Sequence, residues 1–221
     1  MKKSHALVLG ATGASGQMLV KELLNDADFS HVSIYVRNKP AIQHKKLIVH
    51  QIDFSRLGDY KDIIEGDVLF SALGTTLKDA GSKAQQYLVD YTYQFEFAKM
   101  ASENGVSYYS MVSSAGSNKN APFFYPRMKG ALEEEVKKLR FERIHIFQPP
   151  LLIRQQILMR SAEKRALKIL NVLNRFGLLN SQRPLFVSDL AQTMIDEIKK
   201  DRSVGSNVYK PKDIFSLKRT S

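Results

Sequence analysis

The stretch that most constrains the fold is a glycine-rich turn between an apolar run and an amphipathic segment. Gly10, Gly13 and Gly16 follow the apolar run 6–9 at spacings of three. The residues behind them recur at helical spacing and predict a helix: Val20, Leu23, Leu24 and Ala27. Strand, glycine turn and helix, in this order, form the context in which such a motif indicates nucleotide binding.

The glycines of this turn have separate expected roles. Gly10 permits the sharp turn out of the strand, Gly13 lets the backbone approach a pyrophosphate, and Gly16 lets the helix pack closely. The free N–H groups at the helix start would hold the phosphate. The alternative is a glycine-rich turn without a ligand. The residues expected to bind the phosphates are Gly10, Thr12, Gly13, Ala14, Ser15 and Gly16.

Length and composition are those of one α/β domain. The chain has 221 residues, of which 43% are hydrophobic, and no linker or repeat divides it. We expect a single domain over 1–221, with a nucleotide-binding core over 1–150 and a small substrate or lid region over 151–221. No apolar run is long enough to span a membrane. Because the chain has no cysteine and its first apolar run is too short for a signal peptide, we expect a cytoplasmic protein.

The net charge of +11 permits two interpretations. A nucleic-acid or membrane partner is one; a basic surface with a pocket for a polyanionic cofactor is the other. The second is favoured because no nucleic-acid motif accompanies the charge. The histidines lack metal-ligand spacing, so no metal site is expected. The hydrolase nucleophile elbow and the kinase-type phosphate loop are also missing.

The rest of the chain alternates between strand and helix patterns. Strands are expected at 31–36, 46–52, 68–73, 106–112 and 144–147, and helices at 84–104, 126–140 and 187–200. Pro126 is expected at the first helical position, Val187 to Asp189 at a helix cap, and a last strand and tail within 207–217. This alternation predicts a three-layer, doubly wound parallel α/β sheet, the Rossmann fold.

Two segments indicate which nucleotide binds and where. Arg37 stands at the end of the second strand, where an acid would bond the ribose of NAD and an arginine suits the 2′-phosphate of NADP. We therefore expect NADP rather than NAD. The end of the fourth strand should lie beside the phosphates and the nicotinamide ribose: Ser71, Ala72, Leu73, Gly74 and Thr75.

The chemistry is expected at Tyr125 and Lys129, which share a helix face at i and i+4. The ammonium group would lower the pKa of the phenol, so that Tyr125 exchanges a proton with a carbonyl or alcohol. Lys129 would also bond the ribose. Ser114, with Ser113 as second candidate, would bond the same oxygen. Tyr35 and Lys39 have the same spacing, but that pair runs from a strand into a turn.

Two further segments have open interpretations. The long helix carries aromatic residues on two faces, which suggests burial by the sheet and a partner subunit, so the protein is a monomer or a homodimer. The basic segment 154–183 contains an amphipathic pattern. It could form a lid over the substrate, a surface helix at the sheet edge or, less favoured, a membrane-binding helix.

Together, the three glycines, the Ser71 run, Ser113-Ser114, Tyr125…Lys129 and Pro149-Pro150 resemble an atypical short-chain dehydrogenase/reductase. The nearest resemblance is to the Tat-interacting oxidoreductase group and its bacterial relatives. It implies an NADP-binding oxidoreductase, with a regulator that binds the nucleotide without turnover as the alternative and an isomerase third.

The same resemblance bears on two single residues. It gives Asp53 a bond to the adenine amino group, whereas its position also suits a plain helix cap. Pro126, directly after the tyrosine, departs from the pattern and could shift the phenol relative to Lys129.

Overall fold

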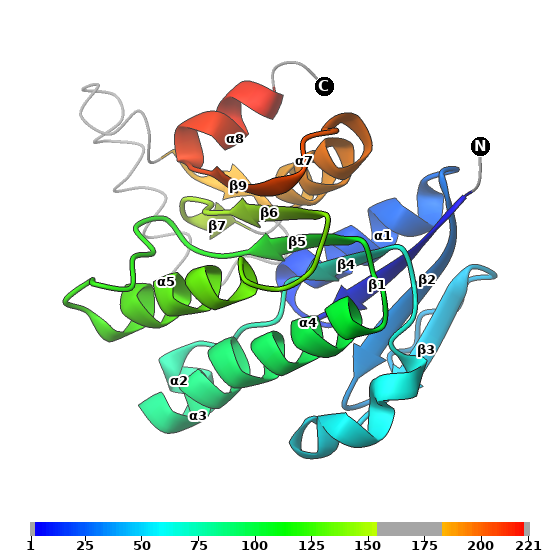
Figure 1. Ribbon diagram of the computed structural model, residues 1–221, viewed down its shortest axis with the longest axis horizontal. Coiled ribbons are helices and arrows are strands. Elements are labelled where there is room, and N and C mark those ends of the chain that lie inside the picture. Colours follow the sequence, from blue (N-terminus) through cyan, green and yellow to red (C-terminus); the bar gives the residue numbers. More distant parts are fainter. Residues whose placement is uncertain (1–2, 154–182, 219–221) are drawn as a thin grey trace.

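The computed structural model describes residues 3–153 and 183–218 (Figure 1). Within these ranges the centre is a seven-stranded sheet with the order β3-β2-β1-β4-β5-β6-β9, and every adjacent pair is parallel. The strands are β1 (Ser4–Leu9), β2 (Phe29–Val36), β3 (Leu47–Gln51), β4 (Val68–Ser71), β5 (Tyr108–Val112), β6 (Arg143–Phe147) and β9 (Gly205–Tyr209). The order reverses between β1 and β4, which is where such sheets bind ligands.

Helices cover both faces of the sheet, so the predicted three-layer Rossmann fold is confirmed (Figure 1). One face carries α1 (Ala14–Asn25), α7 (Val187–Lys200) and α8 (Pro211–Lys218); the other carries α4 (Tyr93–Glu103) and α5 (Phe124–Val136). Alternate residues of β1 feed the two cores: Ala6 and Val8 pack on the α1 side, Leu7 and Leu9 on the α4 side. Burial on both faces explains why this strand is an unbroken apolar run.

The expected long helix is a helix in three parts. α3 (Lys83–Tyr87) continues into the π-helical turn η2 (Leu88–Thr92) and then into α4. The remaining elements are η1 (Phe54–Ile63), α2 (Leu77–Ala80) and a small parallel pair, β7 (Leu152–Ile153) with β8 (Leu185–Phe186). The aromatic stripe lies partly at the surface, where the ring of Tyr91 stacks on Tyr87 at 4.6 Å between centroids.

Several element boundaries differ from the sequence prediction. α1 ends at Asn25, so Ala27 lies outside the helix and is exposed. α5 begins at Phe124, which puts Pro126 at the third helical position; the N–H that proline lacks is unbonded there too.

The C-terminal boundaries also differ. Val187 is already helical, so residues 187–189 form the first turn of α7 rather than its cap. Residues 211–218 form α8 rather than a tail. The basic segment 154–183, for which a lid, a surface helix and a membrane-binding helix were considered, lies outside the described residues, except for Arg183.

Candidate functional site

The glycine turn has the shape that its spacing predicts. Gly10 has φ +82°, and a Cβ there would lie 2.4 Å from the backbone nitrogen of Leu73. A Cβ at Gly16 would lie 2.1 Å from the carbonyl oxygen of Gly10. Both glycines therefore let main chain pack against main chain. A Cβ at Gly13 would come no closer than 3.4 Å to another atom, so the fold itself does not require a glycine at this position.

The start of α1 is open for an anion. Gly13 is its N-cap and offers no side-chain acceptor to the first helical N–H groups. Because these groups have no partner within a helix, they are donors for a phosphate, favoured by the positive end of the helix dipole.

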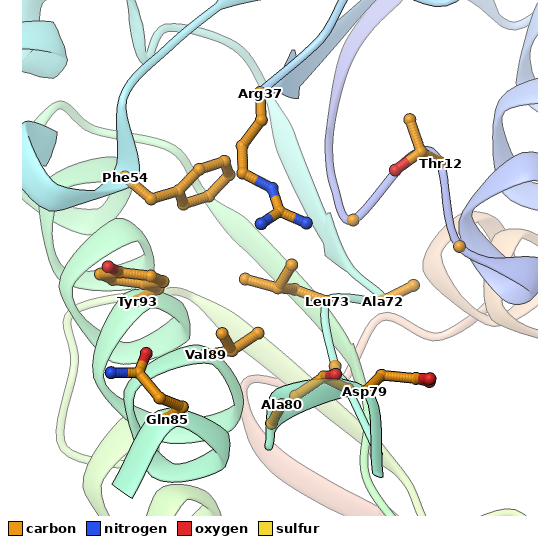
Figure 2. A pocket seen from close by; sticks show the side chains of 14 residues that line it. Thr12, Arg37, Phe54, Ala72, Leu73, Asp79, Ala80, Gln85, Val89 and Tyr93 are labelled. Carbon is orange, nitrogen blue, oxygen red and sulfur yellow. The ribbon is translucent and has the colours of Figure 1, made fainter. Parts of the chain in front are cut away.

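A cavity of about 390 Å³ opens between this turn and the ends of β2 and β4 (Figure 2). Gly10, Thr12 and Gly13 line one side. The guanidinium of Arg37 points into it from the end of β2 (Figure 2), and Arg37 forms no ion pair with a carboxylate of the described residues. The cavity thus combines backbone N–H groups that can bind a phosphate with a guanidinium that no described carboxylate neutralises.

The opposite wall consists of side chains that sequence reasoning did not single out for this site. Phe54 from η1 lies 5.5 Å from the ring of Tyr93 on α4, and both face the cavity with Val89 and Gln85 (Figure 2). Apolar rings and a few polar groups are what a planar base requires. The sequence shows aromatic residues at helical spacing around Tyr93. They lie on two faces of the helix, however, and only the fold shows which face lines the cavity.

Several expected cofactor residues lie away from this cavity. Ala72, Leu73, Gly74 and Thr75 line it as expected, whereas Ala14, Ser15, Gly16, Asp53 and Lys129 are not among its lining residues. The Asp53 carboxylate accepts hydrogen bonds from the backbone N–H (2.9 Å) and the hydroxyl (2.7 Å) of Ser55. These bonds lower the pKa of Asp53. The geometry is that of the helix cap; an adenine contact stays a prediction.

The expectation for Ser71 needs correction. Its side chain is fully buried, and its hydroxyl donates to Gln94 Oε1 at 2.9 Å. Gln94 belongs to a buried polar stripe of three residues, Gln86, Asp90 and Gln94, that faces the end of β4. Gln86 donates to the carbonyl oxygen of Thr75 at 3.2 Å, and Asp90 Oδ2 accepts from the Thr75 N–H at 2.8 Å. This stripe, absent from the sequence prediction, holds the segment after β4.

Tyr125 and Lys129 both lie on α5, one turn apart, as expected. Tyr35, the competing match, is buried in β2 and donates to the carbonyl oxygen of Ile63 at 2.7 Å. Burial raises the pKa of Tyr35. Only the pair on α5 has its two residues on one helix, so the structure separates the two matches as the sequence argument did.

The expected pKa shift of Tyr125 is wrong in direction. Lys129 is almost fully buried and faces Asp90, with 3.6 Å between Nζ and Oδ1. The Asp90 carboxylate therefore counters the ammonium charge. Desolvation, with the Asp90 charge added to it, raises the pKa of Tyr125 to about 12. Burial also lowers the pKa of Lys129 and raises that of Asp90, because it disfavours both charges.

The two serines have different surroundings. Ser113 is buried, and its hydroxyl donates to a carboxylate oxygen of Glu133. Gln148 donates to both oxygens of the same carboxylate, at 3.1 and 2.9 Å. Burial raises the pKa of Glu133. Ser113 is thus engaged in the core, whereas Ser114 is half-buried, and among the described residues its hydroxyl contacts a single carbonyl oxygen, at 3.5 Å.

A second cavity, of about 760 Å³, opens directly after Ser114. Ala115, Gly116, Gln148 and Lys210 are among its lining residues. It lies at the carboxyl ends of β5, β6 and β9, whereas the first cavity lies at the ends of β1, β2 and β4, across the switch point. The two cavities could hold two ligands at one edge of the sheet.

The residues of the first cavity fit a dinucleotide cofactor. The open α1 terminus and the close main-chain packing at Gly10 suit a pyrophosphate, and the Arg37 cation suits a further phosphate. Comparison with known proteins agrees with this fit. The family model described as NAD(P)H-binding matches residues 10–143.

Similar proteins include HTATIP2 and the FMP52 group. HTATIP2 of Rattus norvegicus is 32% identical over 157 residues, which cover 69% of this chain and 64% of the rat protein. FMP52-1 of Scheffersomyces stipitis is 30% identical over 197 residues, 86% of each protein. The chain therefore spans slightly less than two thirds of the rat relative and most of the yeast one.

Solved structures share the fold. The Bordetella bronchiseptica enzyme WbmG in complex with NAD superposes with a TM-score of 0.69 at 15% identity, over 99% of this chain and 78% of WbmG. MoeE5 in complex with UDP-glucuronic acid and NAD gives 0.69 at 16% identity, over 98% and 81%. Identities this low support the fold alone.

The expected cytoplasmic location is wrong, because the FMP52 relatives are named as mitochondrial proteins. That expectation rested on missing cysteines and a short N-terminal apolar run, and neither excludes a mitochondrial compartment. In residues 3–153 and 183–218, no helix is both long and apolar enough to cross a membrane.

Proposed function

The chain belongs to the NAD(P)H-binding family, and from this premise we propose that it is an NADP-dependent oxidoreductase acting on a small carbonyl or alcohol. One observation carries the proposal: the nucleotide cavity is linked to α5 by direct contacts. Thr75, which lines the cavity, bonds Asp90, and Asp90 pairs with Lys129, one turn from Tyr125. This chain of contacts supports Tyr125 as the proton donor of the proposed reaction.

The residues of this chain have assigned roles in the proposed reaction. NADPH, when bound, supplies the hydride. Arg37 and the start of α1 hold the phosphates, Tyr125 donates a proton to the substrate oxygen, and the Ser114 hydroxyl donates a hydrogen bond to the same oxygen. With a pKa of about 12, Tyr125 is protonated at neutral pH. This protonation state favours carbonyl reduction over alcohol oxidation.

A second candidate function is a nucleotide-binding regulator. The observation that favours it is the same Asp90 carboxylate, because a countered Lys129 leaves the phenol a weak acid. General acid catalysis works best when the pKa lies near the operating pH. In this case NADPH binding would stabilise one conformation of the protein for a partner.

The test follows NADPH oxidation over a panel of aldehydes, ketones and quinones. Tyr125→Phe should reduce turnover by roughly 10²–10⁴, the usual contribution of general acid–base catalysis, with NADPH affinity near native. Tyr87→Phe, which removes a hydroxyl from an exposed ring, is the matched control. Native turnover that survives Tyr125→Phe contradicts the mechanism. Tight NADPH binding without turnover on any substrate supports the regulator.

A further inference from the structure

Asp90 is a buried acid in an unusual backbone setting. It lies in the π-helical turn η2, between α3 and α4, and only 1% of it is exposed. Single π-helical turns occur often at functional sites. Burying a carboxylate this deeply costs free energy unless its oxygens have partners. The groups around Asp90 therefore indicate its role.

The two carboxylate oxygens face different partners. Oδ2 accepts the Thr75 N–H at 2.8 Å. Oδ1 lies 3.6 Å from Lys129 Nζ and has no hydrogen-bond partner among the residues that the structure describes. It also lies under Gly74, where a Cβ would come within 3.1 Å of it. One side chain therefore contacts both the cavity-lining segment and α5.

Two acidic side chains act on Lys129 and Tyr125. Glu133, one turn along α5, acts on Lys129, and Asp90 acts on Tyr125. Acids on both η2 and α5 thus raise the pKa of Lys129, whereas the Asp90 charge raises that of Tyr125. Replacing that carboxylate by a neutral group removes the negative charge that adds to desolvation in raising the pKa of Tyr125.

We propose that Asp90 is a positioning residue that joins the two parts of the site: its carboxylate holds the Thr75 segment against the nucleotide and holds Lys129 in place beside Tyr125. The proposal rests on the proposed function only for the identity of the nucleotide. It assigns two separable tasks to one side chain. The hydrogen bond to Thr75 supports nucleotide binding, and the negative charge controls the proton on Tyr125.

Two variants of the full-length protein separate these tasks. Asp90→Asn keeps an acceptor for the Thr75 N–H and removes the charge; Asp90→Ala removes both. NADPH affinity, measured by calorimetry, should fall about tenfold in Asp90→Ala and stay within about threefold in Asp90→Asn. The matched control is Glu96→Gln, which removes an exposed carboxylate from α4, the neighbouring part of the same helix.

The effect of the Asp90 charge on the ionisation of Tyr125 can be measured without following catalytic turnover. The Cζ resonance of Tyr125 in carbon-13-tyrosine protein, assigned by comparison with Tyr125→Phe, is followed towards alkaline pH as far as circular dichroism shows the fold intact. In Asp90→Asn the phenol should begin to ionise about one pH unit or more below native. Glu96→Gln should titrate as native.

The outcomes distinguish this inference from the proposed function. An unchanged Tyr125 titration in Asp90→Asn, or native NADPH affinity in Asp90→Ala, overturns it. If Asp90→Ala does not fold, the titration of Asp90→Asn decides. Both predicted effects in a protein that never oxidises NADPH would support the positioning role and contradict the oxidoreductase.

Discussion

The carboxyl ends of β1 and β2 present a site made mainly of main chain, whereas the carboxyl ends of β4 and β5 present one made of side chains. At the first, Gly10 and Gly16 bring backbone against backbone, and the α1 N–H groups are the donors. At the second, buried polar groups meet in pairs from distant segments, such as Asp90 with Lys129 and Ser113 with Glu133. A main-chain site depends on local sequence, and a side-chain site depends on the whole fold.

The largest expected effects come from the glycines. Gly16→Val puts a Cβ about 2.1 Å from the Gly10 carbonyl oxygen, so α1 must shift, and the free energy of unfolding should fall by roughly 2–3 kcal/mol.

Gly13→Val meets no such clash. It should keep the fold and lose NADPH affinity by at least about 100-fold, because the side chain occupies the phosphate position.

Urea unfolding and calorimetry on the two glycine variants check this split. Tight NADPH binding by a folded Gly13→Val protein would move the phosphate site elsewhere. Native stability of Gly16→Val would show that the turn is less closely packed than its geometry indicates.

A smaller effect is expected at Arg37. This side chain belongs to the site made mainly of main chain, and its proposed role is to bind the 2′-phosphate of NADP. Arg37→Asp should weaken NADPH binding about 10- to 100-fold, the range for a hydrogen-bonded charge, and narrow or invert the preference over NADH. Lys39→Ala is the matched control, since Lys39 is near in sequence but does not line the cavity. Equal affinity of the native protein for NADPH and NADH, in a fluorescence titration, would remove the basis for NADP preference.

The smallest effect concerns pH and sharpens the comparison. Burial raises the pKa of Glu133, so the folded protein holds this proton more tightly than the unfolded chain. The protonated Glu133 side chain contributes fully to the free energy of unfolding below the pKa that it has in the unfolded chain, about pH 4. This contribution is lost as pH rises through the higher pKa of the folded protein. Glu133→Gln should therefore cost about 1–2 kcal/mol in acid and less towards neutral pH.

The contrast in pH dependence separates the two regions. The cost of Gly16→Val should not change over the same pH range, since no titrating group is involved. Urea midpoints measured across the range give both trends. A pH-independent cost for Glu133→Gln would mean that its carboxylate is solvated as in the unfolded chain.

The same contrast explains what the sequence could predict. The glycine turn, Arg37, the parallel sheet and the Tyr125–Lys129 spacing are local patterns, and the structure contains each of them. Asp90 was missed because its partner lies 39 positions away. A signal was available: Asp90 and Gln94 continue the stripe of Phe97 and Ala101, all four buried. Two polar residues on a core-facing stripe predict buried partners, although only the fold identifies them.

The π-helical turn at Leu88–Thr92 makes the length of this helix part of the site. A π-type bond spans five residues rather than four, so the turn holds one residue more than an α-helical turn. Deleting a single residue there would restore the α register and rotate α3 by about 100° relative to α4. Gln86 would then turn away from the Thr75 carbonyl that it bonds. In an aligned sequence, a one-residue gap in this helix is therefore expected to accompany loss of the Gln86–Thr75 hydrogen bond, even where every other position matches.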